Sequence, residues 1–252
     1  MMVIRYERPQ PKNPHALTIK QHVLPARSIT RFSGTDGRVA VRVKDRTEDL
    51  RLPPDDVMFC AQRAWDERAE HGYMKQIEDE FQELADKLLS GSHSMDSTSN
   101  LAISRFYMLI RLRADARASP LPDVELKGIQ GEKLTKDQEE ILEKKWCSFS
   151  RANSGVPGRQ MTGLQIQILL DRLCSSETTW GTVISTDVDF LVPDTFGDIL
   201  IVPLSPKCCL VANAPSGEIT RECGIEVNRI SINKSLNYIL AHDFTKCGIV
   251  GV

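Results

Sequence analysis

The sequence predicts an α+β fold, in which strands from the N- and C-terminal parts form an antiparallel or mixed sheet and a central helical segment packs on it. Two observations predict this class. Short β-prone runs occur toward both ends of the chain, as at Val39 to Val43 and Cys208 to Ala212. The middle instead repeats apolar residues at spacings of three and four, which is typical of helices. Strands and helices that are segregated along the chain are typical of α+β proteins.

Length and composition set the expected organisation. A chain of 252 residues is long enough to bury a substantial core. We therefore expect one domain over residues 16–252, preceded by a flexible, proline-containing N-terminal arm over residues 1–15. No apolar run approaches the roughly 20 residues of a membrane helix, so no membrane span and a cytoplasmic location are expected. The formal net charge of −2 gives no general attraction to nucleic acid.

The first folded unit is predicted to be a small β region. Ala16 to Ile19 and Val39 to Val43 are short β-favouring runs, and the turn signal from Gly34 to Gly37 lies between them. Pro25 fixes φ and lacks an N–H, so the chain must stop pairing as a central strand close to His22. Two strands are therefore expected to bracket the His22 segment.

The middle of the chain, roughly residues 70–175, is predicted to be helical. From Tyr73 to Leu89 the apolar residues follow helical spacing, and Ser90-Gly91 supplies a stop signal. Further helices are predicted over Leu101 to Ala116 with Ser97 or Ser99 as the N-cap, from Thr135 through Trp146 and Phe149, and over Gln160 to Cys174.

The last part, residues 180–252, is predicted to be rich in strands. Four β-prone runs suggest an antiparallel meander: Trp180 to Ser185, Asp189 to Val192, Ile199 to Pro203, and Cys208 to Ala212. A final helix is predicted over Asn233 to Ala241, with Asn233 near its start.

The cysteines and acids give little indication of a metal. The seven cysteines form no C-x-x-C pair and no Cys/His cluster, so structural zinc is not predicted. Four aspartates, Asp171, Asp187, Asp189 and Asp198, could in number hold a divalent ion, but they lack the spacing of a restriction-type metal nuclease. The cofactor stays unknown from the sequence, with a divalent metal as one option.

Several short boxes occur in a characteristic order. They are His22-Val-Leu-Pro25 with Arg31-Phe32, then Phe190 to Asp194, Ile201 to Pro206, and Ile232-Asn233. In this order the chain resembles a widespread bacterial family of unknown function, over nearly its whole length from Lys20. Members of that family open with H-x-V-P-x-x-Y-L-x-x-F and later carry an S-D-N-P-like box, a P-L-S/T-P turn and a terminal asparagine.

The chain departs from this pattern at two places, and the resemblance implies no settled activity. Ser28 and Ile29 stand where the family has tyrosine and leucine. Asp194 is present, but its Asn-Pro neighbours are replaced by Thr195 and Phe196.

The boxes suggest a candidate catalytic site made of His22, Asp194 and Asn233. Histidine titrates near neutrality, so His22 could act as general acid or base while Asp194 orients its imidazole. Arg31 and Arg113 are the candidates for binding an anionic substrate. This combination suits phosphodiester cleavage in RNA or DNA, as in a hydrolase that serves as a toxin or an antiviral defence effector.

Structural roles are the alternative for every one of these residues. The histidine could satisfy backbone carbonyls at the proline bend, Asp194 could order a turn, and Asn233 could cap a helix. The cations that accompany Arg113, on a face shared with Arg117, could form a solvated helix face. The corresponding function is a non-catalytic binding or regulatory subunit of a bacterial defence or conflict system, with nucleic acid or protein as partner. Convergence of the candidate side chains in one pocket would favour the enzyme.

Overall fold

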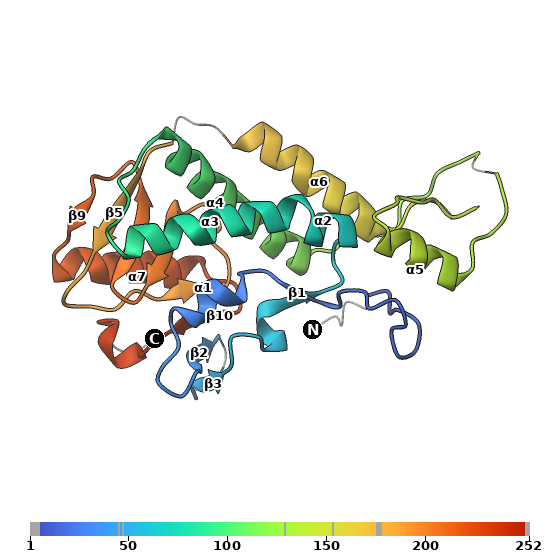
Figure 1. Ribbon diagram of the computed structural model, residues 1–252. Coiled ribbons are helices and arrows are strands. Elements are labelled where there is room, and N and C mark those ends of the chain that lie inside the picture. The colour runs from blue at the N-terminus through green and yellow to red at the C-terminus, as the bar shows by residue number, and fades with distance from the viewer. Residues whose placement is uncertain are drawn as a thin grey trace.

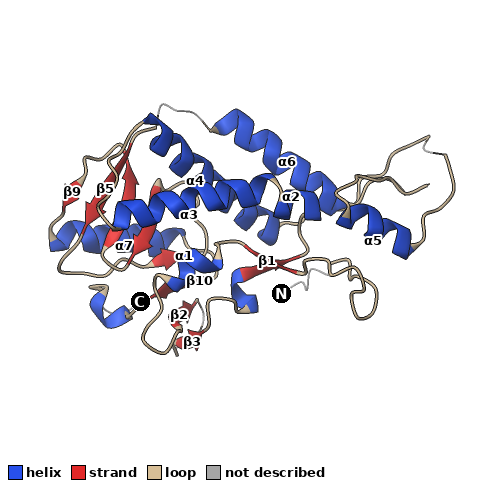
Figure 2. Ribbon diagram, viewed as in Figure 1, coloured by secondary structure: helices blue, strands red, loops and turns tan. Residues whose placement is uncertain are grey.

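A computed structural model describes residues 6–44, 46, 48–128, 130–152, 154–174 and 178–249. Residues 1–5 of the predicted arm and 250–252 of the predicted β-rich part lie outside this range. The described chain combines helices with antiparallel and mixed sheets, so the predicted α+β class is confirmed (Figures 1 and 2).

Three long helices form the middle of the molecule: α3 (Tyr73–Leu89), α4 (Ser97–Ala118) and α6 (Gly158–Leu173). The bounds of α3 are those predicted from its apolar spacing. Helix α4 packs against both α3 and α6. Its N-cap is Asp96, whose side chain accepts a hydrogen bond from the Ser99 backbone N–H, so the predicted serine caps are wrong. Aspartate accepts this bond as well as serine does.

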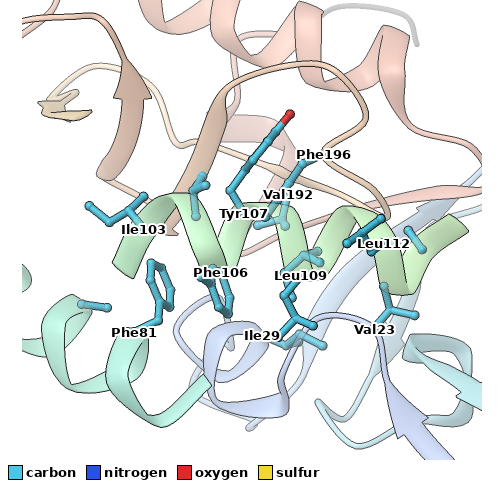
Figure 3. Packing of buried hydrophobic residues seen from close by; sticks show 14 of the residues in the cluster. Val23, Ile29, Phe81, Ile103, Phe106, Tyr107, Leu109, Leu112, Val192 and Phe196 are labelled. Carbon is cyan, nitrogen blue, oxygen red and sulfur yellow. The ribbon is translucent and has the colours of Figure 1, made fainter. Parts of the chain in front are cut away.

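Helix α4 is the centre of the hydrophobic core because apolar residues surround it on several sides. Phe106 stacks on Phe81 of α3, with the ring centroids 3.6 Å apart. Figure 3 shows Ile29 below α4, as Phe81 is, and Phe196 above it. A helix that is apolar around its circumference must be enclosed by the rest of the fold. The other elements are arranged to cover it.

The remaining helices are shorter. They are α1 (Ala26–Thr30), α2 (Glu67–His71), α5 (Lys136–Lys144) and α7 (Arg221–Lys234), with 3₁₀ turns at Val57–Phe59 and Phe244–Lys246. Thr135 caps α5 and forms a capping box with Gln138, as the sequence predicts. The prediction that this helix continues through Trp146 and Phe149 is wrong. Trp146 has a φ of 62°, which is a left-handed conformation that ends a right-handed helix.

Within the described residues, ten strands form three sheets. Strands β1 (Lys20–His22) and β4 (Cys60–Gln62) make an antiparallel pair. The second sheet is antiparallel, with the order β3 (Leu50–Leu52), β2 (Val39–Val43), β10 (Tyr238–Ala241), β6 (Val192–Pro193). The third has the order β7 (Ile201–Ser205), β8 (Cys208–Ala212), β5 (Trp180–Ile184), β9 (Gly217–Glu218), and β9 is parallel to β5. Because β2 and β10 are neighbours, the two ends of the chain share a sheet as predicted.

Three predicted details of the strands are wrong. The first strand is Lys20–His22 rather than Ala16 to Ile19, since Ala16 has a φ of 48° and cannot continue a strand. The simple meander is interrupted because β6 pairs with β10 in the other sheet. The predicted helix from Asn233 to Ala241 is wrong: Asn233 lies in the last turn of α7, and Tyr238–Ala241 form strand β10, whose residues are all buried between β2 and β6.

The stack between α3 and α4 generates a stability prediction. Phe81→Ala is expected to lower the free energy of unfolding by about 3–5 kcal/mol, because it leaves a cavity beside Phe106. Leu173→Ala, at a side chain that is 54% exposed at the end of α6, is expected to change it by less than about 0.5 kcal/mol. Urea unfolding followed by circular dichroism measures both. Equal effects of the two variants would contradict a core centred on α4.

Candidate functional site

His22 lies at the end of β1, directly before the chain turns into α1. Its Nε2 is 3.3 Å from the backbone carbonyl oxygen of Pro54, to which a protonated ring nitrogen donates. Its own backbone carbonyl accepts a hydrogen bond of 3.3 Å from Nη1 of Arg113. The imidazole therefore contacts backbone, and the residue is tied to α4 through its main chain.

The surroundings of His22 favour its neutral form. Burial is the largest influence and lowers the pKa of the imidazole below its ordinary value of 6.5, and the charge of Arg113 acts in the same direction. The Pro54 carbonyl and the carboxylates of Glu78 and Asp55 oppose the shift without cancelling it. His22 is therefore largely uncharged at neutral pH.

Arg113 is enclosed in the core with its own counter-ions. Its side chain is 1% exposed and pairs with Glu78, while Glu70 lies 3.9 Å away. The guanidinium carbon is 5.2 Å from the ring centroid of Trp65, whose Nε1 donates to Glu70 at 2.5 Å. The solvated helix face that was the alternative for this residue is wrong. A substrate could reach Arg113 only by displacing these partners.

Arg31, the second candidate for substrate binding, joins α1 to α3. Its guanidinium is 2.7 Å from the Asp86 carboxylate and also donates to the backbone oxygen of Gln82 at 3.4 Å. Arg27 pairs with the same carboxylate. The charge of Arg31 is thus shared with a residue of α3.

Asp194 orders the turn that precedes β10. One carboxylate oxygen accepts from the Leu236 backbone N–H at 2.7 Å. The other accepts from both the backbone N–H of Asn237 at 2.7 Å and its side-chain amide at 2.9 Å. The side chain is largely buried, and these three bonds account for the partners of its two oxygens among the described residues. This geometry is that of a structural carboxylate.

Asn233 is exposed, in the last turn of α7. It caps no helix start, because α7 begins at Arg221 with Thr220 as its N-cap. Within the described part of the chain, its side chain makes no hydrogen bond. The asparagine that bonds to Asp194 is Asn237, which the sequence interpretation missed. Its only signal was its place directly before the apolar run of β10.

The three candidate catalytic side chains have separate surroundings. In the described structure, no hydrogen bond joins any two of His22, Asp194 and Asn233, and none of the three lines the cavity beside Arg42 or the one beside Arg105. Helix α4 lies near two of the boxes. Arg113 contacts the His22 carbonyl. One turn later in α4, the guanidinium carbon of Arg117 is 5.8 Å from the ring centroid of Tyr238. The backbone carbonyl of Tyr238 in turn accepts a hydrogen bond from the Asp194 N–H.

A cluster around Glu7 is the most highly charged feature that the sequence interpretation missed. The Glu7 carboxylate contacts three cations, which we call the basic cluster: Lys136, Arg151 and Arg159. The Arg151 contact is 2.7 Å long. Residues of the predicted N-terminal arm are therefore held against α5 and α6. The sequence gives no signal for this contact because it joins positions more than 120 residues apart.

Acidic residues from α5 hold the basic cluster from its inner side. Arg151 pairs with Glu139 and Arg159 pairs with Glu143, each at 2.7 Å. Glu143 also pairs with Arg63 at 2.7 Å, and both of those side chains are almost completely buried. Arg151 also pairs with Asp123 at 3.0 Å, so each arginine of the basic cluster has at least one acidic partner besides Glu7.

Glu7 is ionised because of these cations. Burial alone would raise the pKa of its carboxyl group, but Arg159 and Lys136, followed by Arg151, outweigh burial and lower the pKa from 4.5 to about 2. The cations thus favour the docked, charged form of the carboxylate.

No group of three or more His, Cys, Asp or Glu side chains among the described residues is arranged to hold a metal ion. None of the described helices has the length and apolar character needed to cross a bilayer.

Comparisons with protein-family models, with curated proteins and with solved structures give no match for this chain. The resemblance inferred from the ordered boxes therefore stays a prediction.

The Asp194 geometry predicts a structural rather than a catalytic role. Asp194→Ala is expected to lower the free energy of unfolding by about 2–3 kcal/mol, since it removes the carboxylate that accepts three hydrogen bonds in the turn before β10. Asn233→Ala, at an exposed side chain, is expected to change it by less than about 0.5 kcal/mol. Chemical unfolding of both variants measures this. A fully stable Asp194→Ala protein would contradict the assignment.

The Glu7 geometry predicts a pH dependence. The pKa of Glu7 is lower in the folded chain than its ordinary value, so the ionised carboxylate stabilises the fold above pH 4.5, and this contribution is lost as the pH falls toward about 2. The difference in unfolding free energy between the natural chain and Glu7→Gln is therefore expected to be constant near neutrality and to shrink below pH 4.5. Glu132→Gln, at an exposed residue with no ion pair among the described residues, serves as the control. A difference that grows on acidification would contradict the prediction.

Proposed function

We propose that this chain is a non-catalytic binding or regulatory component, and that it contacts a partner protein through the basic cluster beneath Glu7. A general acid or base needs an orienting partner and access to substrate. His22 has a backbone carbonyl as its partner, and Asp194 is engaged by the turn before β10. These contacts give little support to nucleic-acid cleavage by this pair.

The observation that carries the proposal is the docking of one carboxylate on three cations. Glu7 belongs to a segment that has no regular secondary structure before β1. Other bonds also hold this segment. Gln10 donates to Glu140 and Asp137 of α5, His15 lies 2.7 Å from Asp137, and Lys144 donates to the Ala16 carbonyl oxygen at 2.8 Å. Arg63 donates to the Glu7 backbone oxygen at 2.8 Å. A carboxylate from another protein could take the place of Glu7 on the same cations.

The charge around the cluster favours a single carboxylate over a polyanion. Glu139 and Glu143 already engage Arg151 and Arg159 from the inner side. Binding of a nucleic-acid backbone depends on many phosphate contacts, each made by a cation. A cluster in which acids compensate much of the charge is better matched to one acidic side chain of a protein.

Exposed apolar residues at the same end of the molecule support a protein partner. The segment around residues 121–126 lies near α5, and it is tied to the loop before α6 by the bridge between Val124 and Val156 (Figure 1). Four large apolar side chains in these segments are at least 36% exposed: Leu121, Val124, Leu126 and Trp146. Exposed apolar residues, and aromatic ones above all, are typical of protein interfaces.

The proposal predicts that the cluster accepts a carboxylate in trans. A labelled peptide copying residues 6–17 is expected to bind the Glu7→Gln chain at least about tenfold more tightly than the natural chain, because Glu7 no longer competes. The same peptide with glutamine at the position of Glu7 is the matched control and is expected to bind weakly to both. Fluorescence anisotropy at low and high salt measures the affinities. Equal binding of the two peptides to the Glu7→Gln chain would contradict the proposal.

Nucleic-acid cleavage is the competing function, and it is tested directly. Labelled RNA and DNA are incubated with the natural chain and with His22→Ala, with and without Mg²⁺. We expect both substrates to stay intact. Cleavage by the natural chain that is lost in His22→Ala would replace the binding proposal with a hydrolase that uses His22.

A further inference from the structure

A cavity lies between α3, α4 and α6. It has a volume of about 270 Å³ and opens to solvent, and it is separate from the basic cluster. Its polar lining comes from Gln76 and Glu80 of α3, Arg105 of α4, and Gln167 and Asp171 of α6. Its volume lies just below the range of about 300–1,000 Å³ for pockets that hold drug-sized ligands. It therefore suits a smaller molecule.

The charged groups of this cavity do not neutralise one another. Arg105 lines it together with Glu80 and Asp171, but within the described chain Arg105 has no carboxylate oxygen within the 4.0 Å limit of an ion pair. By the same measure, neither carboxylate has a cation. Arg105, Glu80 and Asp171 are all exposed to solvent, whereas the buried arginines Arg113 and Arg159 are paired with acids. The cavity thus displays one cation and two anions that face a common space.

The floor of the cavity is apolar and fixed. Ile77 and Leu170 line it beside the ring of Tyr73. The Tyr73 hydroxyl donates to the Gly163 carbonyl oxygen at 2.6 Å, which ties α3 to α6 beneath the cavity. The stack of Phe81 on Phe106 fixes α3 against α4. The three walls are thus positioned by core contacts before any ligand binds, which lowers the entropic cost of binding.

We infer that this cavity binds a small zwitterion, namely a free amino acid with an apolar side chain. The carboxylate of the ligand would pair with Arg105, and its ammonium group with Glu80 and Asp171. The apolar side chain would lie on Ile77 and Leu170. Guanidinium groups bind carboxylates through charge-assisted hydrogen bonds. One cation and two anions on a fixed apolar floor match a ligand with one negative group, one positive group and an apolar part.

The experiment is a thermal-shift screen of the full chain with each standard amino acid, followed by calorimetric titration of the best ligand. We expect saturable binding of one or more apolar amino acids, and a loss of about tenfold or more in affinity for Arg105→Gln, because a charge-assisted bond is removed. Arg172→Gln removes an exposed cation of α6 that does not line the cavity, and it is expected to bind normally. Circular dichroism checks that both variants fold.

Two modified ligands test the roles of the charges. The amide of the best ligand lacks the carboxylate, and its N-acetyl form lacks the ammonium group, so both are expected to bind at least about tenfold more weakly. Equal binding of the amide would mean that the cavity takes cations, and equal binding of the N-acetyl form would mean that it takes simple carboxylates; either result overturns the inference. So would the absence of saturable binding by any amino acid, or an equal loss in Arg105→Gln and Arg172→Gln. Glu7→Gln is expected to leave the affinity for the amino acid unchanged, so the experiment tests this cavity independently of the basic cluster.

Discussion

Arg113 carries its positive charge at a position where its side chain is 1% exposed, and the arrangement of the helical layer depends on how that charge is compensated. An unpaired buried charge costs several kcal/mol, so the fold must bring acids to it. Glu78 comes from α3 and Glu70 from α2, while Trp65 supplies its ring face and orients Glu70. The same guanidinium bonds to the carbonyl of His22 on β1. One side chain thus fixes the positions of α2, α3 and the first strand around α4.

A second buried network, around Glu143 of α5, works on the same principle. Arg159 and Arg63 share Glu143, and Glu7 completes the outer side of the basic cluster. The two networks differ in one respect. All the partners of Arg113 belong to helices or strands, or lie next to them, whereas Glu7 belongs to a segment without regular structure. Such segments open more readily than packed helices. An exchange of partners is therefore easier at Glu7 than at Arg113, and for this reason we place the binding function at the basic cluster.

Sequence patterns predicted those helices whose formation depends on residues close together in the chain. The apolar spacing of Tyr73–Leu89 and the capping box at Thr135 contain the information that fixes those helices. Trp146 ends α5 through its own backbone conformation, which no apolar periodicity records. The run at Tyr238–Ala241 is a strand because β2 and β6 lie on either side of it. The Glu7 contacts could not be predicted, since they pair residues far apart in the sequence.

The candidate site shows why an ordered set of sequence boxes can predict an architecture better than an activity. The Asp194 box orders the turn into β10, and the His22 box ends β1 at the point where Arg113 reaches its carbonyl. Both sets of contacts connect terminal strands to the layer around α4, so both boxes can be explained by the needs of folding. A site residue has a different signature, namely a polar group that faces open space without a partner in the protein. Arg105, Glu80 and Asp171, the charged residues of the cavity between α3, α4 and α6, lie in none of the boxes.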